Sequence, residues 1–147
     1  MSPESENSFL DTNILVYAYD NTAEEKHQVA RKIVLDCMKG NTSLTVSNQI
    51  LGETANTILK KQPNISKKEM QELIEDILQN PFWIKINYTG KTILNAFTLL
   101  EPGDDFWDLV IAQTMLENGI TKIYTENTKD FEKIKGIKAV NPFTEKS

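Results

Sequence analysis

Short apolar runs alternate with longer segments of helical periodicity along the chain, and this alternation limits the possible folds more than any other feature. Apolar residues that recur three and four positions apart predict amphipathic helices between the runs. Strands separated by helices form parallel βαβ units with right-handed crossovers. The sequence therefore predicts an α/β fold, a three-layer α/β/α sandwich with a four- or five-stranded, mostly parallel sheet. The expected strands are a short run that ends at Asp11 and residues 43–46, 83–86, 122–125 and 137–140.

Capping signals predict where the helices begin and end. Thr22 and Glu25 have the spacing of a capping box, and so do Ser66 and Glu69. Ser47 is a favoured N-cap residue, and glycines and prolines follow several of the periodic segments. The expected helices run from the Thr22 box to Gly40, from Ser47 to Lys60, from Ser66 to before Pro81, from about Thr89 to Leu100, and from about Phe106 to Asn118.

Length and composition favour one domain. The chain has 147 residues, so we expect a single domain over residues 1–147, with residues 1–7 as a polar, flexible N-terminus. No stretch resembles a membrane span or a secretory signal, and we expect a cytoplasmic protein with no membrane partner. The single cysteine, Cys37, excludes an internal disulfide and a cysteine-rich zinc site. The net charge of −5 disfavours a nucleic-acid binder, although a carboxylate cluster that binds cations would lower the net charge while reversing the local sign.

Acidic residues interrupt apolar segments at three places. Asp11 directly follows the first strand, Glu53 lies in the helix after the second strand, and Asp108 is the only charge between Phe106 and Met115. A buried carboxylate requires a partner. Ordinary explanations compete at each place, because Asp11 is a favoured helix cap, most helix glutamates are solvated, and Asp108 fits a box-like cap with Asp105.

A further acidic segment follows the strand at 122–125. Glu126, Asn127 and Asp130 are typical turn residues, but one or both of the two acids could complete a cluster of oxygen ligands. Ligands of parallel sheets bind at the carboxyl ends of the strands, where Asp11 and this segment both lie. The combination of Asp11, Glu53, Asp108 and Asp130 therefore predicts a site for Mg²⁺ or Mn²⁺, which prefer carboxylate oxygens.

The residues that are missing limit the other chemistries. His27 is the only histidine, so a histidine pair for metal-free RNA cleavage cannot form, and a Ser-His-Asp triad would have to use this helix residue. The sequence has no glycine-rich phosphate loop. A carboxylate-bound metal ion is therefore the simplest remaining route to hydrolysis, and two such ions roughly 3.5–4 Å apart suit in-line displacement at phosphorus.

Three segments together resemble the PIN-domain family, and most of all its small single-domain toxins of VapC type. They are FLDTNILVYAYD (9–20), SNQILGETANTILKK (47–61) and FWDLVIAQTMLENGITKIYTENTKDF (106–131). The resemblance implies a metal-dependent endoribonuclease, a homodimer, and an antitoxin protein that blocks the site.

The same resemblance assigns roles to individual residues. It implies that Asp11, Glu53 and Asp108 are the catalytic and metal-binding acids, and that Thr12 and Asn13 support the first of them. Many members of the family have a fourth aspartate after a threonine and one further residue, although asparagine also occurs there. Here Thr125 is followed at that spacing by Asn127, and Asp130 is the nearest spare carboxylate. This departure leaves open whether Asn127 or Asp130 fills the fourth position and whether one or two ions bind.

Two other functions compete with the nuclease. A PIN-like module that binds RNA or a protein without cutting would explain Asn127. A phosphoacceptor receiver domain also has an aspartate at a strand end, but it requires a paired acid in the first strand and an aspartate at the end of a middle strand. Neither the run at 43–46 nor the run at 83–86 ends in one.

Two groups of residues remain open as contacts with partners. Four lysines could contact an RNA backbone, although solvation of helix ends is their more ordinary role; they are Lys60, Lys61, Lys67 and Lys68. Three aromatic residues belong either to the core, the more frequent fate of such residues, or to an interface; they are Phe82, Trp83 and Trp107.

Overall fold

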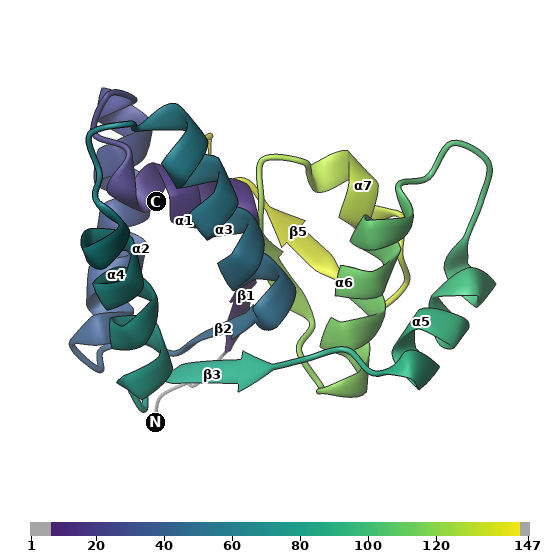
Figure 1. Ribbon diagram of the computed structural model, residues 1–147. Coiled ribbons are helices and arrows are strands. Elements are labelled where there is room, and N and C mark those ends of the chain that lie inside the picture. Colours follow the sequence, from purple (N-terminus) through teal and green to yellow (C-terminus); the bar gives the residue numbers. More distant parts are fainter. Residues whose placement is uncertain (1–6, 145–147) are drawn as a thin grey trace.

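A five-stranded, wholly parallel sheet forms the centre of the computed structural model, which describes residues 7–144 (Figure 1). The order across the sheet is β3-β2-β1-β4-β5. The predicted fold class is confirmed. The strands are β1 (Ser8–Leu10), β2 (Leu44–Ser47), β3 (Trp83–Ile86), β4 (Lys122–Tyr124) and β5 (Lys138–Val140).

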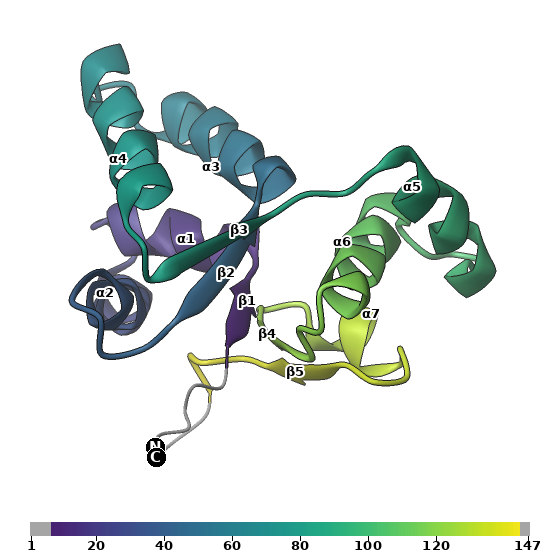
Figure 2. The same cartoon turned by 90° about the horizontal axis from the view of Figure 1, so that it is seen from below.

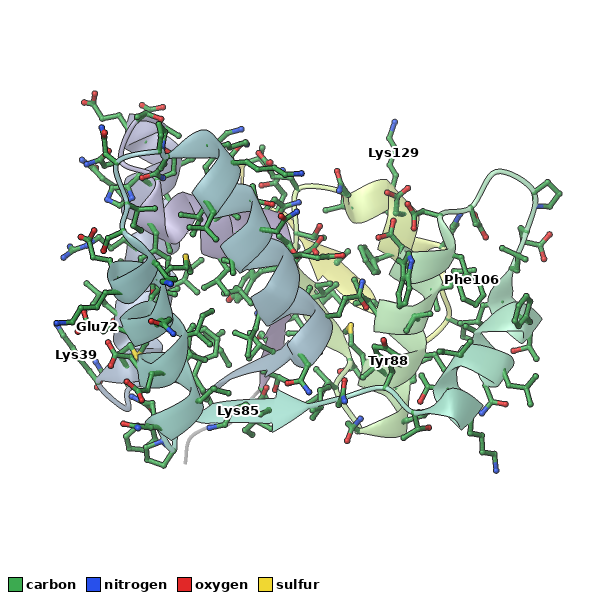
Figure 3. All side chains as sticks on the ribbon, viewed as in Figure 1. Lys39, Glu72, Lys85, Tyr88, Phe106 and Lys129 are labelled. Carbon is green, nitrogen blue, oxygen red and sulfur yellow. The ribbon has the colours of Figure 1, made fainter. Side chains whose placement is uncertain are left out.

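Helices cover both faces of the sheet and form the two outer layers (Figure 2). On one face lie α1 (Thr12–Tyr19), α2 (Glu24–Met38), α3 (Asn48–Lys61) and α4 (Lys67–Gln79). On the other face lie α5 (Gly90–Ala96), α6 (Phe106–Glu117) and α7 (Thr128–Glu132), and a 3₁₀ turn, η1 (Phe97–Leu99), follows α5. Charged side chains such as Lys39, Glu72 and Lys129 point outward from these layers (Figure 3). No helix in the described part of the chain is long and apolar enough to cross a membrane.

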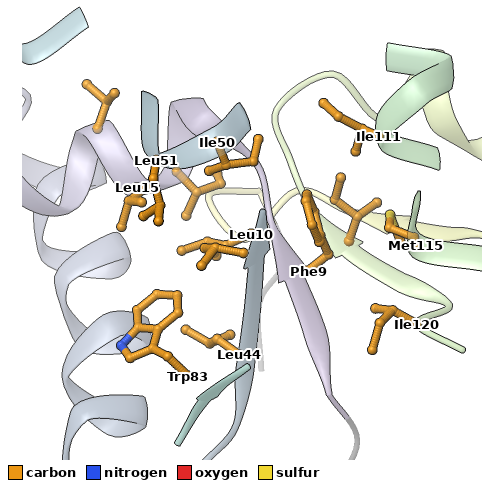
Figure 4. Close-up of a cluster of buried hydrophobic side chains, with 14 of the residues drawn as sticks. Phe9, Leu10, Leu15, Leu44, Ile50, Leu51, Trp83, Ile111, Met115 and Ile120 are labelled. Atoms are coloured by element: carbon orange, nitrogen blue, oxygen red, sulfur yellow. The ribbon is translucent and has the colours of Figure 1, made fainter. Parts of the chain in front are cut away.

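Successive residues of β1 supply the core on the two faces of the sheet. Leu10 points toward Leu15 and Ile50, while Phe9 points to the opposite side, toward Met115 of α6 (Figure 4). All five side chains are buried. This alternation follows from the period of two in a β-strand. Phe9 and Leu10 are therefore both apolar, because each packs against the helices on its own face of the sheet.

The order of the strands produces a crevice beside β1. The chain adds β2 and β3 on one side of β1 and then crosses over to add β4 and β5 on the other side. After β1 the chain enters α1 on one face of the sheet, and after β4 it enters α7 on the other face. A point where neighbouring strands lead to opposite faces is the usual ligand site of such sheets.

Some predicted helix boundaries are right. Ser66 and Glu69 form the expected capping box, and the hydroxyl of Ser47 accepts a hydrogen bond from the amide of Ile50 at 3.3 Å. Gly40 follows α2 with a φ of +83°, a conformation that glycine adopts without strain.

Other local predictions are wrong. The N-cap of α2 is Ala23 rather than Thr22, because the hydroxyl of Thr22 donates to Asp20 instead of capping the helix. The helix expected over residues 89–100 ends as an α-helix at Ala96 and continues only as the 3₁₀ turn. The turn expected around Asp130 is the short helix α7.

The predicted flexible N-terminus at residues 1–7 lies outside the described residues except for Asn7. The side-chain amide of Asn7 donates a hydrogen bond to the hydroxyl of Ser43 at 2.6 Å, which holds the start of β1 beside the start of β2.

Candidate active site

Asp11 is held at the carboxyl end of β1 by hydrogen bonds to both of its carboxylate oxygens. The amide of Thr12 donates to Oδ1 at 2.8 Å, and the hydroxyl of Thr125 donates to Oδ2 at 2.7 Å. The first bond makes Asp11 the N-cap of α1, and the second links β1 to the segment after β4. Asp11 is therefore both a cap and a fixed carboxylate at the crevice, so the two explanations of this residue are compatible.

Burial and nearby negative charge raise the pKa of Asp11. Burial makes the largest contribution, and the charges of Glu53 and Asp130 act in the same direction. The hydrogen bonds from Thr125 and Thr12 lower the pKa, but they do not reverse the net shift. The ionised form of Asp11 is thus held at a place that disfavours negative charge, which is the condition that a bound cation would relieve.

Asp108 lies in the first turn of α6, close enough to Asp11 for their charges to interact. The N-cap is Asp105, whose carboxylate accepts hydrogen bonds from the amides of Trp107 at 2.8 Å and Asp108 at 3.3 Å. Partial burial raises the pKa of Asp108 to about 7, followed in importance by the charge of Asp105 and then by that of Asp11. Asp108 consequently belongs to the same negative electrostatic environment as Asp11.

Glu53 is exposed on α3, and two polar side chains orient it. The hydroxyl of Thr12 donates to Oε1 at 2.7 Å, and the side-chain amide of Gln49 donates to Oε2 at 3.2 Å. Glu53 is close enough to contribute to the raised pKa values of both Asp11 and Asp108. The sequence signal for Glu53 was weak because its position depends on the packing of α3 beside α1.

A cleft of about 390 Å³ joins these acids. Six of the predicted site residues line it, and they are Asp11, Thr12, Asn13, Glu53, Asp108 and Asn127. The two others lie outside the lining: Thr125 supports Asp11 from behind, and Asp130 is exposed on α7. The charge of Asp130 nevertheless raises the pKa values of Asp11 and Asp108.

The loop after β4 is fixed to the cleft by its backbone. The amide of Glu126 donates to the side-chain oxygen of Asn13 at 3.4 Å, and the amide of Asn127 donates to the hydroxyl of Thr125 at 2.9 Å. The carboxylate of Glu126 forms an ion pair with Lys26 at 2.6 Å. Glu126 is therefore engaged by α2 and does not line the cleft.

Comparison with known proteins identifies the family of the chain. The family model described as PIN domain matches residues 8–137. The chain belongs to the PIN-domain family. A search of curated proteins found no match.

Two solved structures have the same fold as this PIN domain. One is VapC20 of Mycobacterium tuberculosis, described as a sarcin-ricin loop cleaving toxin, with 17% identity, a TM-score of 0.65, and coverage of 88% of this chain and 95% of that chain. The other is VapBC2 of Rickettsia felis bound to a DNA fragment from its promoter, with 24% identity, a TM-score of 0.59, and coverage of 92% and 98%. At these identities the likeness establishes the fold.

The cleft of this PIN domain has the donor chemistry of a divalent-cation site. Among residues 7–144, no three histidine, cysteine or acidic side chains come together as a complete ligand group. Mg²⁺, however, keeps several waters and is commonly bound by one or two carboxylates together with substrate phosphates. Asp11 and Asp108 fit this mode of binding, because they line the same cleft, and burial together with neighbouring negative charges raises the pKa values of both.

Sequence reasoning missed several residues that line the cleft. Asp105 was interpreted only as a cap, and Trp107 as core or interface, yet both line the cleft. Of the four lysines that the sequence offered as possible RNA contacts, Lys61 lines the cleft, whereas Lys67 and Lys68 line a separate groove between α3 and α4. The adjacent acids at 104 and 105 were the one available signal for Asp105, while the position of Lys61 depends on how α3 packs.

Proposed function

We propose that this PIN domain is a divalent-metal-dependent endoribonuclease that hydrolyses RNA phosphodiester bonds with Mg²⁺ or Mn²⁺. The main support is one observation: Asp11 and Asp108, which are far apart in the sequence, share a cleft in which burial first, and neighbouring negative charge second, raise the pKa of Asp108 to about 7. Repulsion between the carboxylates and their burial both disfavour the ionised forms, and a cation bound between the carboxylates would offset this cost.

The residues of the cleft have separate roles in this proposal. Asp11 and Asp108 would hold the cation, and Glu53 would hold it directly or through water. When bound, the cation supplies activation of water and neutralises charge on the phosphate. Thr12 and Gln49 orient Glu53, while Thr125 fixes Asp11.

The fourth position of the cluster remains divided between two residues. Asn127 lines the cleft, and its side chain offers one neutral oxygen ligand. Asp130 lies outside the lining but within electrostatic range. We propose Asn127 as the residue near the cation and Asp130 as a carboxylate that adds negative potential, which favours one tightly bound ion over two.

Cleavage of a mixed pool of structured and single-stranded RNA tests the proposal. The purified protein should cut the pool with Mg²⁺ or Mn²⁺ and should stop cutting in EDTA. Asp11→Asn and Asp108→Asn should lose the activity, while Asp36→Asn should keep it, because Asp36 pairs with Lys32 on α2 and does not line the cleft. Cutting that persists in Asp11→Asn would refute the metal assignment.

We further propose that the protein is the toxin of a toxin–antitoxin pair and acts in the cytoplasm as a homodimer. The fold shared with VapC20 and VapBC2 supports this assignment. Induced expression of the wild-type chain in bacteria should arrest growth, and Asp11→Asn should not. Growth that continues despite normal amounts of folded wild-type protein would count against the toxin role.

An apolar groove between α3 and α4 suits an antitoxin helix. Its volume is about 800 Å³. The lining combines apolar side chains, among them Leu59, Met70, Ile74 and Leu78, with two lysines, Lys67 and Lys68, and two glutamates, Glu72 and Glu75. An amphipathic helix with apolar residues facing the groove and charges of both signs at its edges would match it.

A binding module without catalysis is the second candidate. The absence of a complete three-residue ligand group among residues 7–144, together with asparagine at 127, favours it. This candidate predicts weak or absent binding of divalent cations and no cutting of RNA by the folded protein. Tight Mg²⁺ binding that depends on Asp11 would exclude it.

A further inference from the structure

Trp107 is an exposed aromatic residue at the rim of the acidic cleft. It is the second residue of α6, directly before Asp108, and 47% of its surface is exposed. Trp83, in contrast, is 1% exposed and belongs to the core. Exposure alone is ordinary for an apolar side chain, but Trp107 also lines the acidic cleft, where it presents an aromatic surface to any ligand that enters.

A neighbouring ring fixes the position of Trp107. Tyr88, which follows β3, packs edge-on against Trp107 with 5.8 Å between ring centroids and 66° between ring planes. Tyr88 lies against α6 in Figure 3. The contact holds the indole in place before any ligand arrives, which reduces the entropy that binding would otherwise cost.

A second cavity adjoins the cleft at Trp107. Its volume is about 450 Å³, and its lining shares Trp107, Gln49 and Glu53 with the acidic cleft. Its remaining lining residues are Asn48, Asn87 and Tyr88. Asn48 and Asn87 are both exposed, and the side-chain amide of each can offer two donors and an acceptor to a ligand.

This combination of groups matches the chemistry of an unpaired nucleobase. Proteins recognise single-stranded RNA by stacking bases on aromatic side chains and by hydrogen bonds to the base edges. Trp107 provides the stacking surface, and the amides of Asn48 and Asn87 provide groups for the base edge. Trp107 and Glu53 line both this cavity and the acidic cleft, so the stacking surface lies directly beside the proposed cation-binding acids.

We propose that Trp107 and the adjoining cavity form a subsite for one unpaired base of an RNA substrate, next to the phosphate that is cut. The inference rests on the proposed nuclease function and adds the place in the fold where one unpaired base of the substrate would bind. Purines, which have the larger ring surface, should bind more strongly than pyrimidines.

Nuclear magnetic resonance of the indole N–H groups tests the subsite without any cutting. The two tryptophans give two indole signals, and Trp107→Phe assigns them by removing one. The probes are the four nucleoside 5′-monophosphates, with ribose 5-phosphate as the control that lacks a base, all in Mg²⁺. None of these probes contains a phosphodiester, so the result does not depend on nuclease activity.

The subsite predicts a specific pattern of shifts. The Trp107 signal should move with the nucleotides, most with the purines, and should stay in place with ribose 5-phosphate. The signal of buried Trp83, whose N–H donates to the sulfur of Met38 at 3.3 Å, should remain unchanged. An unchanged Trp107 signal, or equal shifts with nucleotides and ribose 5-phosphate, would overturn the inference.

Kinetics on single-stranded RNA give a second readout. Trp107→Ala should raise KM by about 5- to 100-fold with little change in kcat, because stacking contributes binding energy of that size. Trp107→Phe, which keeps an aromatic ring, should restore most of the affinity. Phe82→Ala is the matched control, since Phe82 is 45% exposed but precedes β3 and lines neither cavity.

The outcomes separate the two proposals. Wild-type cutting of RNA with an unchanged KM in Trp107→Ala would leave the nuclease intact and overturn the base subsite. Nucleotide-dependent shifts of the Trp107 signal in a protein that cuts no RNA would support the subsite and refute the nuclease.

Discussion

At the scale of single residues, the site depends on carboxylates that are costly to keep ionised. Asp11 is buried, and both of its oxygens accept hydrogen bonds. Asp108 is half-buried beside Asp105, and the pKa of Asp108 rises to about 7. The fold therefore gives up some stability at this cleft, as functional sites commonly do.

The first prediction concerns how the stability of the folded protein changes with pH because of Asp108. The pKa of Asp108 is about 7 in the folded protein against an ordinary value of 3.8, so the folded state binds more protons between these pH values. Stability therefore falls as pH rises through this window. Asp108→Asn should raise stability at pH 8 by about 1 kcal/mol after solvent screening of the half-exposed group, or about 3 °C in Tm.

Thermal unfolding in EDTA at pH 8 and pH 5 checks this prediction. The gain in Asp108→Asn should be smaller at pH 5, where most of the wild-type carboxyl is already protonated. Addition of Mg²⁺ at pH 8 should raise the Tm of the wild-type protein alone. A variant that is less stable than the wild type at pH 8 in EDTA would contradict the sign of the shift.

A second prediction at this scale concerns buried hydroxyl groups. Among the described residues, Thr54 has a buried hydroxyl oxygen with no hydrogen-bond partner, while the buried hydroxyl of Thr114 donates to the carbonyl of Val110 at 2.6 Å. Thr54→Val should stabilise the fold by about 1 kcal/mol, and Thr114→Val should destabilise it by a similar amount. Urea unfolding of both variants measures the difference, and equal effects would refute the distinction.

At the scale of helices and strands, the sequence predicted the elements whose signals are local. The strands were recognisable because each is a short apolar run, and the helix that begins after Ser66 was recognisable because its capping box forms as expected. The box at Thr22 failed because Asp20 captures the hydroxyl of Thr22. The helix α7 was missed because Asn127 and Asp130 are usual turn residues, and packing of the buried Phe131 lies outside any local pattern.

The sequence likewise pointed only to those residues of the candidate site that have local signals. The positions of Asp11 and Asp108 followed from strand ends and apolar context, and the cleft contains both. The relative placement of α3 and α6 brings three further residues into the lining of the cleft; they are Trp107, Asp105 and Lys61. Their contribution depends on contacts between distant segments, which periodicity and capping rules do not describe.

The Ser66 capping box gives the prediction at this scale. Ser66 accepts a hydrogen bond from the amide of Glu69 at 3.0 Å, and the Glu69 carboxylate accepts one from the amide of Ser66 at 2.8 Å. Ser66→Ala should destabilise the protein by about 1 kcal/mol, and Ser66→Asp should retain most of the stability because aspartate is also a favoured cap. Denaturant unfolding measures the stability of both variants. An unchanged midpoint in Ser66→Ala would show that packing alone holds α4.

At the scale of the whole molecule, apolar surface outside the core supports the proposed homodimer. Leu94 and Phe97, on α5 and the 3₁₀ turn after it, are 67% and 56% exposed, and Leu100 is exposed beside them. Exposed apolar patches of this kind commonly mark protein interfaces. The patch lies on the face of the sheet opposite to the α3–α4 groove, so a dimer there would leave the groove free for another partner.

Light scattering during gel filtration tests the dimer. The wild-type protein should have about twice the 16.7 kDa mass of the chain. Phe97→Glu should shift it to the monomer, and Val29→Glu, on the exposed side of α2, should not. A monomeric wild type would refute the homodimer, while a dimeric Phe97→Glu would refute this patch as its interface.

The central claim is that the acidic cleft holds a divalent cation, and calorimetric titration of Mg²⁺ or Mn²⁺ into the purified protein tests it most directly. The account predicts saturable binding to the wild type and to Asp36→Asn, with loss of binding in Asp11→Asn and Asp108→Asn. Absence of binding to the folded wild type, or equal binding in all four proteins, would contradict it and favour the binding module.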